Sequence, residues 1–203
     1  GTATFSDKNI GTTKVVTANG ITLSGTAAGN YTQNTVASST ANITVRSLAV
    51  TITASNKTYD GNTNASVTYL DNRVAGDVFT VSGTATFATK TVANGKTVTA
   101  NSITIEGTDA ANYTHNVSTT ALANITSRSL TVTITASDKV YDRLTAASVV
   151  YADNRVAGDT FTVSGSATFS DRVVGASKTV TATGIAISGT DAANYTQNTT
   201  ATT

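Results

Sequence analysis

The sequence predicts an all-β protein built from tandem repeats. Three observations lead to this prediction: a segment of 82 residues recurs, apolar and polar residues alternate along several segments, and the helix formers Leu and Glu are scarce. Strict alternation is the pattern of a half-buried strand, and the abundant Thr and Val favour strands. No segment shows a sustained period of 3.6 residues, so at most a short helical turn is expected, near Thr108–Asn112.

The repeat determines the expected domain organisation. The segment Asp71–Asp77 returns unchanged 82 residues later, and Asn112-Tyr113-Thr114 has copies both 82 residues earlier and 82 residues later. A period of this length suits a small domain with its own core, because the coils of a solenoid repeat at about 20–50 residues. We expect the C-terminal half of a repeat, a full repeat, and a nearly full repeat without its last strand, over residues 1–45, 46–127 and 128–203.

Within one repeat, alternation marks the strands. Apolar residues alternate with Thr or Ser over 50–54, 67–69 and 79–87, alternation continues over 98–105, and residues 121–125 close the repeat. In the fourth segment Val98 and Ala100 are in one phase, whereas Ile103 and Ile105 are in the other. A change of phase requires either a tight turn or a β-bulge, and we place it at Asn101-Ser102.

One turn and one linker refine the fold. The segment Thr108–Tyr113 resembles the turn of immunoglobulin-like domains in which a tyrosine hydroxyl bonds back to the backbone. The linker Thr126–Ser129 contains no Gly or Pro, unlike a flexible tether. We therefore expect immunoglobulin-like β-sandwich repeats in an elongated rod, with small β-grasp-like repeats as the alternative. The tyrosines at the predicted turn anchors are Tyr31, Tyr113 and Tyr195.

Composition argues against several classes of protein. The net charge is +1, so no basic surface for nucleic acid is expected. No apolar run is long enough for membrane insertion, and the chain has no cysteine for disulfides or zinc thiolates. The single histidine, His115, is replaced by Gln33 and Gln197 in the other repeats. A catalytic triad would need a histidine in each repeat, so we expect no enzyme activity.

Aspartates are the acidic residues that recur between repeats. Four of them have a copy 82 residues later: Asp60, Asp71, Asp77 and Asp109. Aspartate commonly caps turns through backbone hydrogen bonds, and that is the role we expect here. Calcium binding is the alternative, because carboxylates are its preferred ligands. We expect no other cofactor.

The repeat also resembles a known family. Tyr59-Asp60-Gly61, then Gly76-Asp77, Lys96-Thr97-Val98 and the Asn112-Tyr113 turn, are similar to the YDG repeats of large secreted bacterial adhesins, including filamentous-haemagglutinin-like proteins. The later copy departs from this motif, because Arg143 replaces Gly61. The resemblance implies a secreted protein at the bacterial cell surface in an adhesin context.

Two functional hypotheses remain open from the sequence. In the first, the repeats are spacers of an adhesin stalk that project a distal binding domain, and their partners are the neighbouring repeats. In the second, each repeat weakly binds a host glycan or protein, and many copies multiply the effect. The second hypothesis requires an exposed aromatic residue shared between repeats, and the candidates are Tyr69 and Tyr151.

Overall fold

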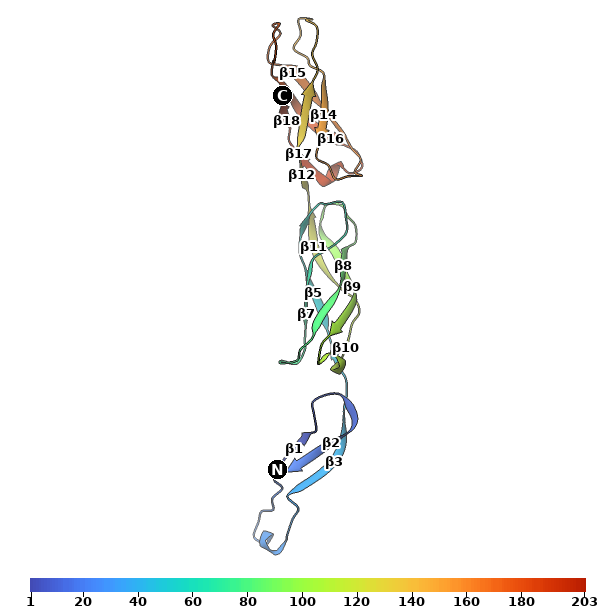
Figure 1. Ribbon diagram of the computed structural model, residues 1–203, viewed down its shortest axis with the longest axis vertical. Helices are drawn as coiled ribbons and strands as arrows, with labels where there is room; N and C mark the ends of the chain where they lie inside the picture. The colour runs from blue at the N-terminus through green and yellow to red at the C-terminus, as the bar shows by residue number, and fades with distance from the viewer. The chain divides into compact units, whose positions relative to one another are not determined.

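The computed structural model describes residues 1–203 and is all-β, with three short 3-10 helices and no α-helix (Figure 1). It therefore contains no helix with the length and hydrophobicity of a membrane span. Two compact units make up the chain. The first comprises residues 1–52, 69–84 and 100–119, and the second comprises 53–68, 85–99 and 120–203. Each compact unit contains one boundary between consecutive repeats.

The first repeat is a sheet of three antiparallel strands in the order β1-β2-β3. The strands are β1 (Thr2–Phe5), β2 (Gly11–Asn19) and β3 (Val36–Ile43), with the 3-10 helix η1 (Ala28–Asn30) before the last. Its apolar side chains are poorly covered: Phe5 is 41% exposed, whereas its copy Phe87 is 2% exposed. The Phe87 ring is covered in part by Lys57, whose Nζ lies 5.6 Å from the ring centre.

The second repeat contains a four-stranded sheet in the order β6-β11-β9-β8 and two pairs, β5-β7 and β4-β10. The apolar residues that alternate in the sequence are the buried ones, including Val98, Ala100, Ile103 and Ile125. The strands are β4 (Arg46–Leu48), β5 (Val50–Ala54), β6 (Lys57–Thr58), β7 (Val67–Asp71), β8 (Thr80–Phe87), β9 (Ala93–Glu106), β10 (Tyr113–His115) and β11 (Thr119–Thr126), with η2 (Ala110–Asn112) at the predicted helical turn.

The third repeat follows the same order. Its sheets are β15-β16-β18, β13-β14 and the parallel pair β12-β17. The core again consists of the alternating apolar residues, such as Val132, Val180 and Ile185. The elements are β12 (Arg128–Leu130), β13 (Val132–Ala136), β14 (Val149–Asp153), β15 (Thr162–Phe169), β16 (Val180–Ser188), η3 (Ala192–Asn194), β17 (Tyr195–Gln197) and β18 (Thr200–Thr202).

The change of phase inside the long strand is a β-bulge and not a turn. In the third repeat Gly184 and Ile185 of β16 lie opposite the single residue Gly165 of β15. The residue at the bulge has a positive φ, 61° at Gly184 and 51° at its copy Ser102. The extra residue turns the following side chains to the other face, which explains why Ile185 and Val180 are both buried despite their odd spacing.

Consecutive repeats are joined by very short links. Only Ser127 separates β11 from β12, and two residues, Thr44 and Val45, separate β3 from β4. Strand therefore passes almost directly into strand, as a linker without Gly or Pro suggested. So short a link holds the loops at the end of one repeat close to the beginning of the next.

Candidate functional site

The candidate site is built on a group of polar side chains at the beginning of each full repeat, which we call the acidic end. In the second repeat it consists of Asp77, Asp109 and Asn112, and in the third repeat of their copies Asp159, Asp191 and Asn194. Asp77 closes a turn in which its amide donates to the Val74 carbonyl, at 3.1 Å. Asp109 precedes η2, and its Oδ2 accepts a hydrogen bond from the Val78 amide at 2.9 Å.

A tyrosine at the start of the next strand holds this turn. The Tyr113 hydroxyl accepts a hydrogen bond from the Val74 amide at 2.9 Å and donates one to Asp77 Oδ2 at 2.6 Å. Its ring packs on Phe79, with ring centres 5.2 Å apart. Tyr195 makes the same two hydrogen bonds, to Val156 and Asp159, at 2.8 and 2.6 Å.

In the first compact unit, the loop between β1 and β2 contacts the acidic end of the second repeat. Lys8 Nζ lies 2.9 Å from Asp77 Oδ1 and 2.6 Å from Asp109 Oδ1. Two residues later, the Ile10 amide donates to Asn112 Oδ1 at 2.9 Å. One cation and one backbone amide of the first repeat are thus bound by the second, and we call this arrangement the first joint.

The second compact unit repeats the arrangement with residues 82 positions later. Lys90 Nζ, in the loop between β8 and β9, lies 3.2 Å from Asp159 Oδ1 and 3.9 Å from Asp191 Oδ1. The Val92 amide donates to Asn194 Oδ1 at 2.9 Å. Lys90 is therefore the copy of Lys8, and this second joint uses the same chemistry as the first.

The second joint has one further component, the tyrosine of the Tyr59-Asp60-Gly61 motif. The Tyr59 hydroxyl donates to Asp159 Oδ1 at 3.0 Å across the repeat boundary. Its ring meets Tyr195 edge to face, with centres 5.5 Å apart and planes at 75°, a favoured aromatic geometry. Tyr59 is only 1% exposed, so the motif tyrosine is buried at a contact between repeats.

Charge and hydrogen bonding at the joints shift the ionisation of the acidic groups. The Tyr113 hydroxyl and then Lys8 lower the pKa of Asp77, and Lys8 together with the Val78 amide lowers that of Asp109. Burial alone would raise the pKa of Asp159, but hydrogen bonds from Tyr195, Tyr59 and Lys90 outweigh it, so the pKa is lowered. All three carboxylates are therefore held in the charged form that the lysines require.

The pKa values of the tyrosine and lysine partners are raised. Burial, and then the hydrogen bond to Asp159, raises the pKa of Tyr195 to about 12. The same carboxylate, followed by the Tyr59 hydroxyl, raises the pKa of Lys90.

These shifts set a pH window for the joints. An aspartate whose pKa is lowered on folding stabilises the folded state at pH values above its unfolded pKa of about 4. This stabilisation is lost as the pH falls through the folded pKa. A tyrosine whose pKa is raised on folding stabilises the folded state below its unfolded pKa of about 10. For Tyr195 this stabilisation is lost as the pH rises toward the folded pKa of about 12. We expect the urea midpoint of unfolding to be flat from about pH 5 to 9.5 and to fall on both sides. A midpoint that keeps rising below pH 4 would contradict this reading.

Gly61 lies where a side chain would press against the following repeat at the second joint. Its φ is +80°, and a Cβ built on it would lie 2.7 Å from Cγ1 of Val156 in the third repeat. We expect Gly61→Ala to lower the free energy of unfolding by about 1–3 kcal/mol, from backbone strain and the close contact together.

The two causes are separated by a second substitution. In a Val156→Ala background, Gly61→Ala should retain the strain but lose the contact, so its cost should fall. The control is Arg143→Gly, at the copy of Gly61, where φ is +69°. Removing that strain should raise the free energy of unfolding by about 0.5–1 kcal/mol. If Gly61→Ala costs as much in the Val156→Ala background as in the parent chain, the contact with Val156 contributes nothing to the cost.

The remaining recurrent aspartates pair within their own loops. Asp71 Oδ2 lies 2.5 Å from Arg73 Nη2, and Asp60 Oδ1 lies 2.7 Å from Lys57 Nζ. Within residues 1–203 no three His, Cys, Asp or Glu side chains gather in a group able to hold a metal ion. At the joints, a lysine ammonium occupies the position between two carboxylates that a calcium ion would need.

Tyr31 and the predicted binding aromatics lie in surroundings that differ from those of the anchors Tyr113 and Tyr195. The predicted anchor Tyr31 is 68% exposed, and its hydroxyl has neither a backbone amide that donates to it, as Val74 does to Tyr113, nor a carboxylate that accepts from it, as Asp77 does. The predicted binding aromatics Tyr69 and Tyr151 are half-buried, with their hydroxyl groups buried and unpartnered against Gly83 and Gly165. Those hydroxyl groups therefore point into the protein and away from solvent.

The unpartnered hydroxyl of Tyr69 gives a simple prediction. A buried polar group without a hydrogen bond destabilises the folded state. We expect Tyr69→Phe to raise the free energy of unfolding by about 1 kcal/mol, measured by urea denaturation. Tyr113→Phe, which removes a hydroxyl with two partners, is the control and should be destabilising. Loss of stability in Tyr69→Phe would show that the hydroxyl has a partner in solution.

Sequence reasoning missed the two lysines and two asparagines of the joints. A signal was present, because a basic residue recurs at positions 8, 90 and 172 as Lys8, Lys90 and Arg172.

The structure also explains why His115 and Gln197 occupy equivalent positions in their repeats. Each ring or amide nitrogen lies near a carbonyl across the sheet, His115 Nε2 at 2.9 Å from Ile103 O and Gln197 Nε2 at 3.4 Å from Ile185 O.

Comparison with known families agrees with the repeat. The model of the YDG domain matches three successive segments, residues 1–41, 44–121 and 126–203. No curated protein and no solved structure matches the chain. Because the three matched segments cover nearly all of its residues, the chain belongs to the YDG domain family.

Proposed function

We propose that these repeats are structural spacers of a bacterial cell-surface adhesin, and that they project a distal binding domain from the cell. The repeats would be small immunoglobulin-like β-sandwiches, and their role would be mechanical and not catalytic. The observation that supports this proposal most is the joint: Lys8 and Lys90, 82 residues apart, each bind two aspartates of the following repeat.

The chemistry of the joint suits a spacer. Each boundary has a link of one or two residues, so the entropy lost on docking the loops is small. At the second joint a buried tyrosine, an ion pair and a backbone hydrogen bond would then oppose bending. A module with a fixed angle to its neighbour extends the reach of a stalk by the same amount with every copy.

Small-angle X-ray scattering tests the proposal. We expect a maximum dimension equal to the summed lengths of the repeats, about 35 Å for each full one. The profile should be the same with calcium and with a chelator, because in each joint a lysine already contacts both carboxylates. A Lys8→Ala, Lys90→Ala double variant should give a broader distribution of dimensions. A Lys178→Ala variant is the control, because this lysine pairs with Asp171 inside one loop of the third repeat.

Two outcomes would overturn the spacer proposal. One is a flexible profile for the parent chain that straightens only with calcium. The other is measurable binding of the parent chain to host glycans or cells, which would favour the weak multivalent binder instead.

A further inference from the structure

The third repeat presents a copy of the joint surface that residues 1–203 leave uncovered. Its residues correspond to the joint residues of the second repeat in register: Tyr141 to Tyr59, Arg172 to Lys90 and Val174 to Val92. Tyr141 is 56% exposed where Tyr59 is 1% exposed, and Val174 is 81% exposed. We call these three residues the socket.

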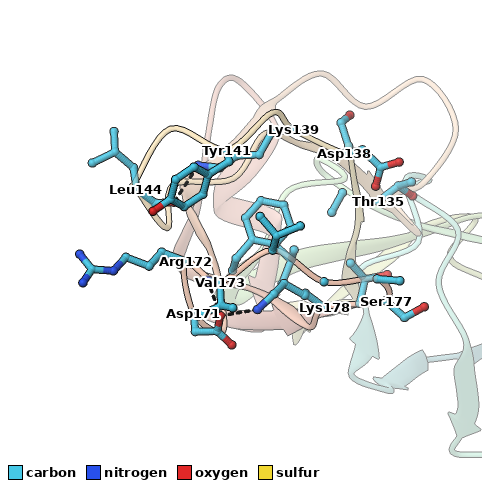
Figure 2. Close-up of a pocket in the computed structure, with 18 residues that line it drawn as sticks. Thr135, Asp138, Lys139, Tyr141, Leu144, Asp171, Arg172, Val173, Ser177 and Lys178 are labelled. Atoms are coloured by element: carbon cyan, nitrogen blue, oxygen red, sulfur yellow. Dashed lines mark hydrogen bonds and ion pairs between the residues drawn. The ribbon is translucent and has the colours of Figure 1, made fainter.

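The three socket residues help to line an open pocket of about 590 Å³ between the loops 138–144 and 171–178. Figure 2 shows Tyr141 beside Lys139, and the side chain of Arg172 extended away from the pocket, free of Asp171, which pairs instead with Lys178. The guanidinium is therefore available to an acidic group from outside. Its planar fork suits two carboxylates at least as well as the lysine ammonium of the other joints.

We propose that the socket binds the acidic end of another YDG repeat, and that Arg143 restricts which repeat it accepts. The first part follows from the two joints already described, in which the same positions bind a pair of aspartates and an asparagine. Charge is complementary, since Arg172 takes the place of Lys90. The proposal rests on the spacer function and deepens it by naming the partner of this surface.

The second part follows from the close contact at Gly61. A Cβ there would lie 2.7 Å from Val156 of the docked repeat, and the third repeat carries Arg143, with a Cβ, at this position. A docking repeat with valine at that site would be obstructed. The partner is therefore a YDG repeat with a residue smaller than valine at the position of Val156.

The experiment extends the chain in register. A second copy of residues 122–203, placed directly after Thr203, continues the period of 82 and supplies a new acidic end. The control adds only a copy of residues 122–126, which completes the last strand without an acidic end. In both, hydrogen exchange of the Val174 amide is measured by NMR, since its counterpart at Val92 donates to Asn194.

We expect at least tenfold slower exchange at Val174 in the long extension than in the short one, provided that the appended copy of Val156 is changed to Ala. With valine retained, the protection should be weaker, and Arg143→Gly should restore it. Arg172→Ala should abolish the protection, whereas Arg46→Ala, at an arginine outside the joints, should leave it unchanged.

The outcomes separate this proposal from the spacer function. If Val92 is protected and Val174 exchanges equally fast in both extensions, the socket does not bind a YDG repeat and the proposal fails. If Val92 itself exchanges freely, the joints are not formed in solution and the spacer function fails. If valine and alanine give equal protection, Arg143 selects nothing and the second part is overturned.

Discussion

Replacing Tyr59 with alanine should lower the free energy of unfolding by about 3–5 kcal/mol, the range for truncating a buried aromatic side chain. The ring is 1% exposed and packs edge to face on Tyr195 of the next repeat. Its removal would leave a cavity and would also remove one of the three hydrogen-bond donors to Asp159. Urea denaturation followed by circular dichroism measures the effect.

The chain contains a matched control for this prediction. Tyr141 occupies the same position in the third repeat but is 56% exposed. Tyr141→Ala should therefore change stability by no more than about 0.5 kcal/mol. Tyr59→Phe should fall between the two, because it retains the ring contact and loses only the hydrogen bond to Asp159. Equal costs for Tyr59→Ala and Tyr141→Ala would show that the contact between repeats contributes nothing to stability.

Replacing Asp159 with alanine should have the second largest effect, a loss of about 2–4 kcal/mol. Its side chain is 1% exposed and accepts hydrogen bonds from Tyr59, Tyr195 and Lys90. Without the carboxylate the Tyr59 hydroxyl is buried with no acceptor, and Lys90 keeps only the longer contact to Asp191 at 3.9 Å. Hydrogen bonds to a charged group are among the stronger ones, which is why the expected loss is large.

Asp77→Ala in the first joint is the control for Asp159→Ala. Asp77 has the Lys8 and Tyr113 contacts but no tyrosine from the preceding repeat. We expect a smaller loss there. A double-mutant cycle of Tyr59→Phe and Asp159→Ala should show a coupling of about 1 kcal/mol. Zero coupling would mean that the hydrogen bond across the boundary is not formed in solution.

Both predictions concern contacts that local sequence patterns do not encode. The alternation along β5, β8 and β9 was sufficient to locate strands, because a side chain on a pleated strand faces the core at every second residue. The change of phase at Ser102 was sufficient to predict an irregularity, and the structure shows a bulge at its copy Gly184. Local geometry produces both features, so a short window of sequence contains them.

The sequence by itself determined the all-β class, the period of 82, the helical turn at η2 and the equivalence of residues between repeats. Only the tertiary structure decided strand order and which side chains meet at the boundaries. Tyr59 lies 100 residues from Asp159, and Lys90 lies 69 residues from it. Such contacts depend on how whole strands are arranged in space. The sequence marks Tyr59 as recurrent, but folding brings it against the neighbouring repeat.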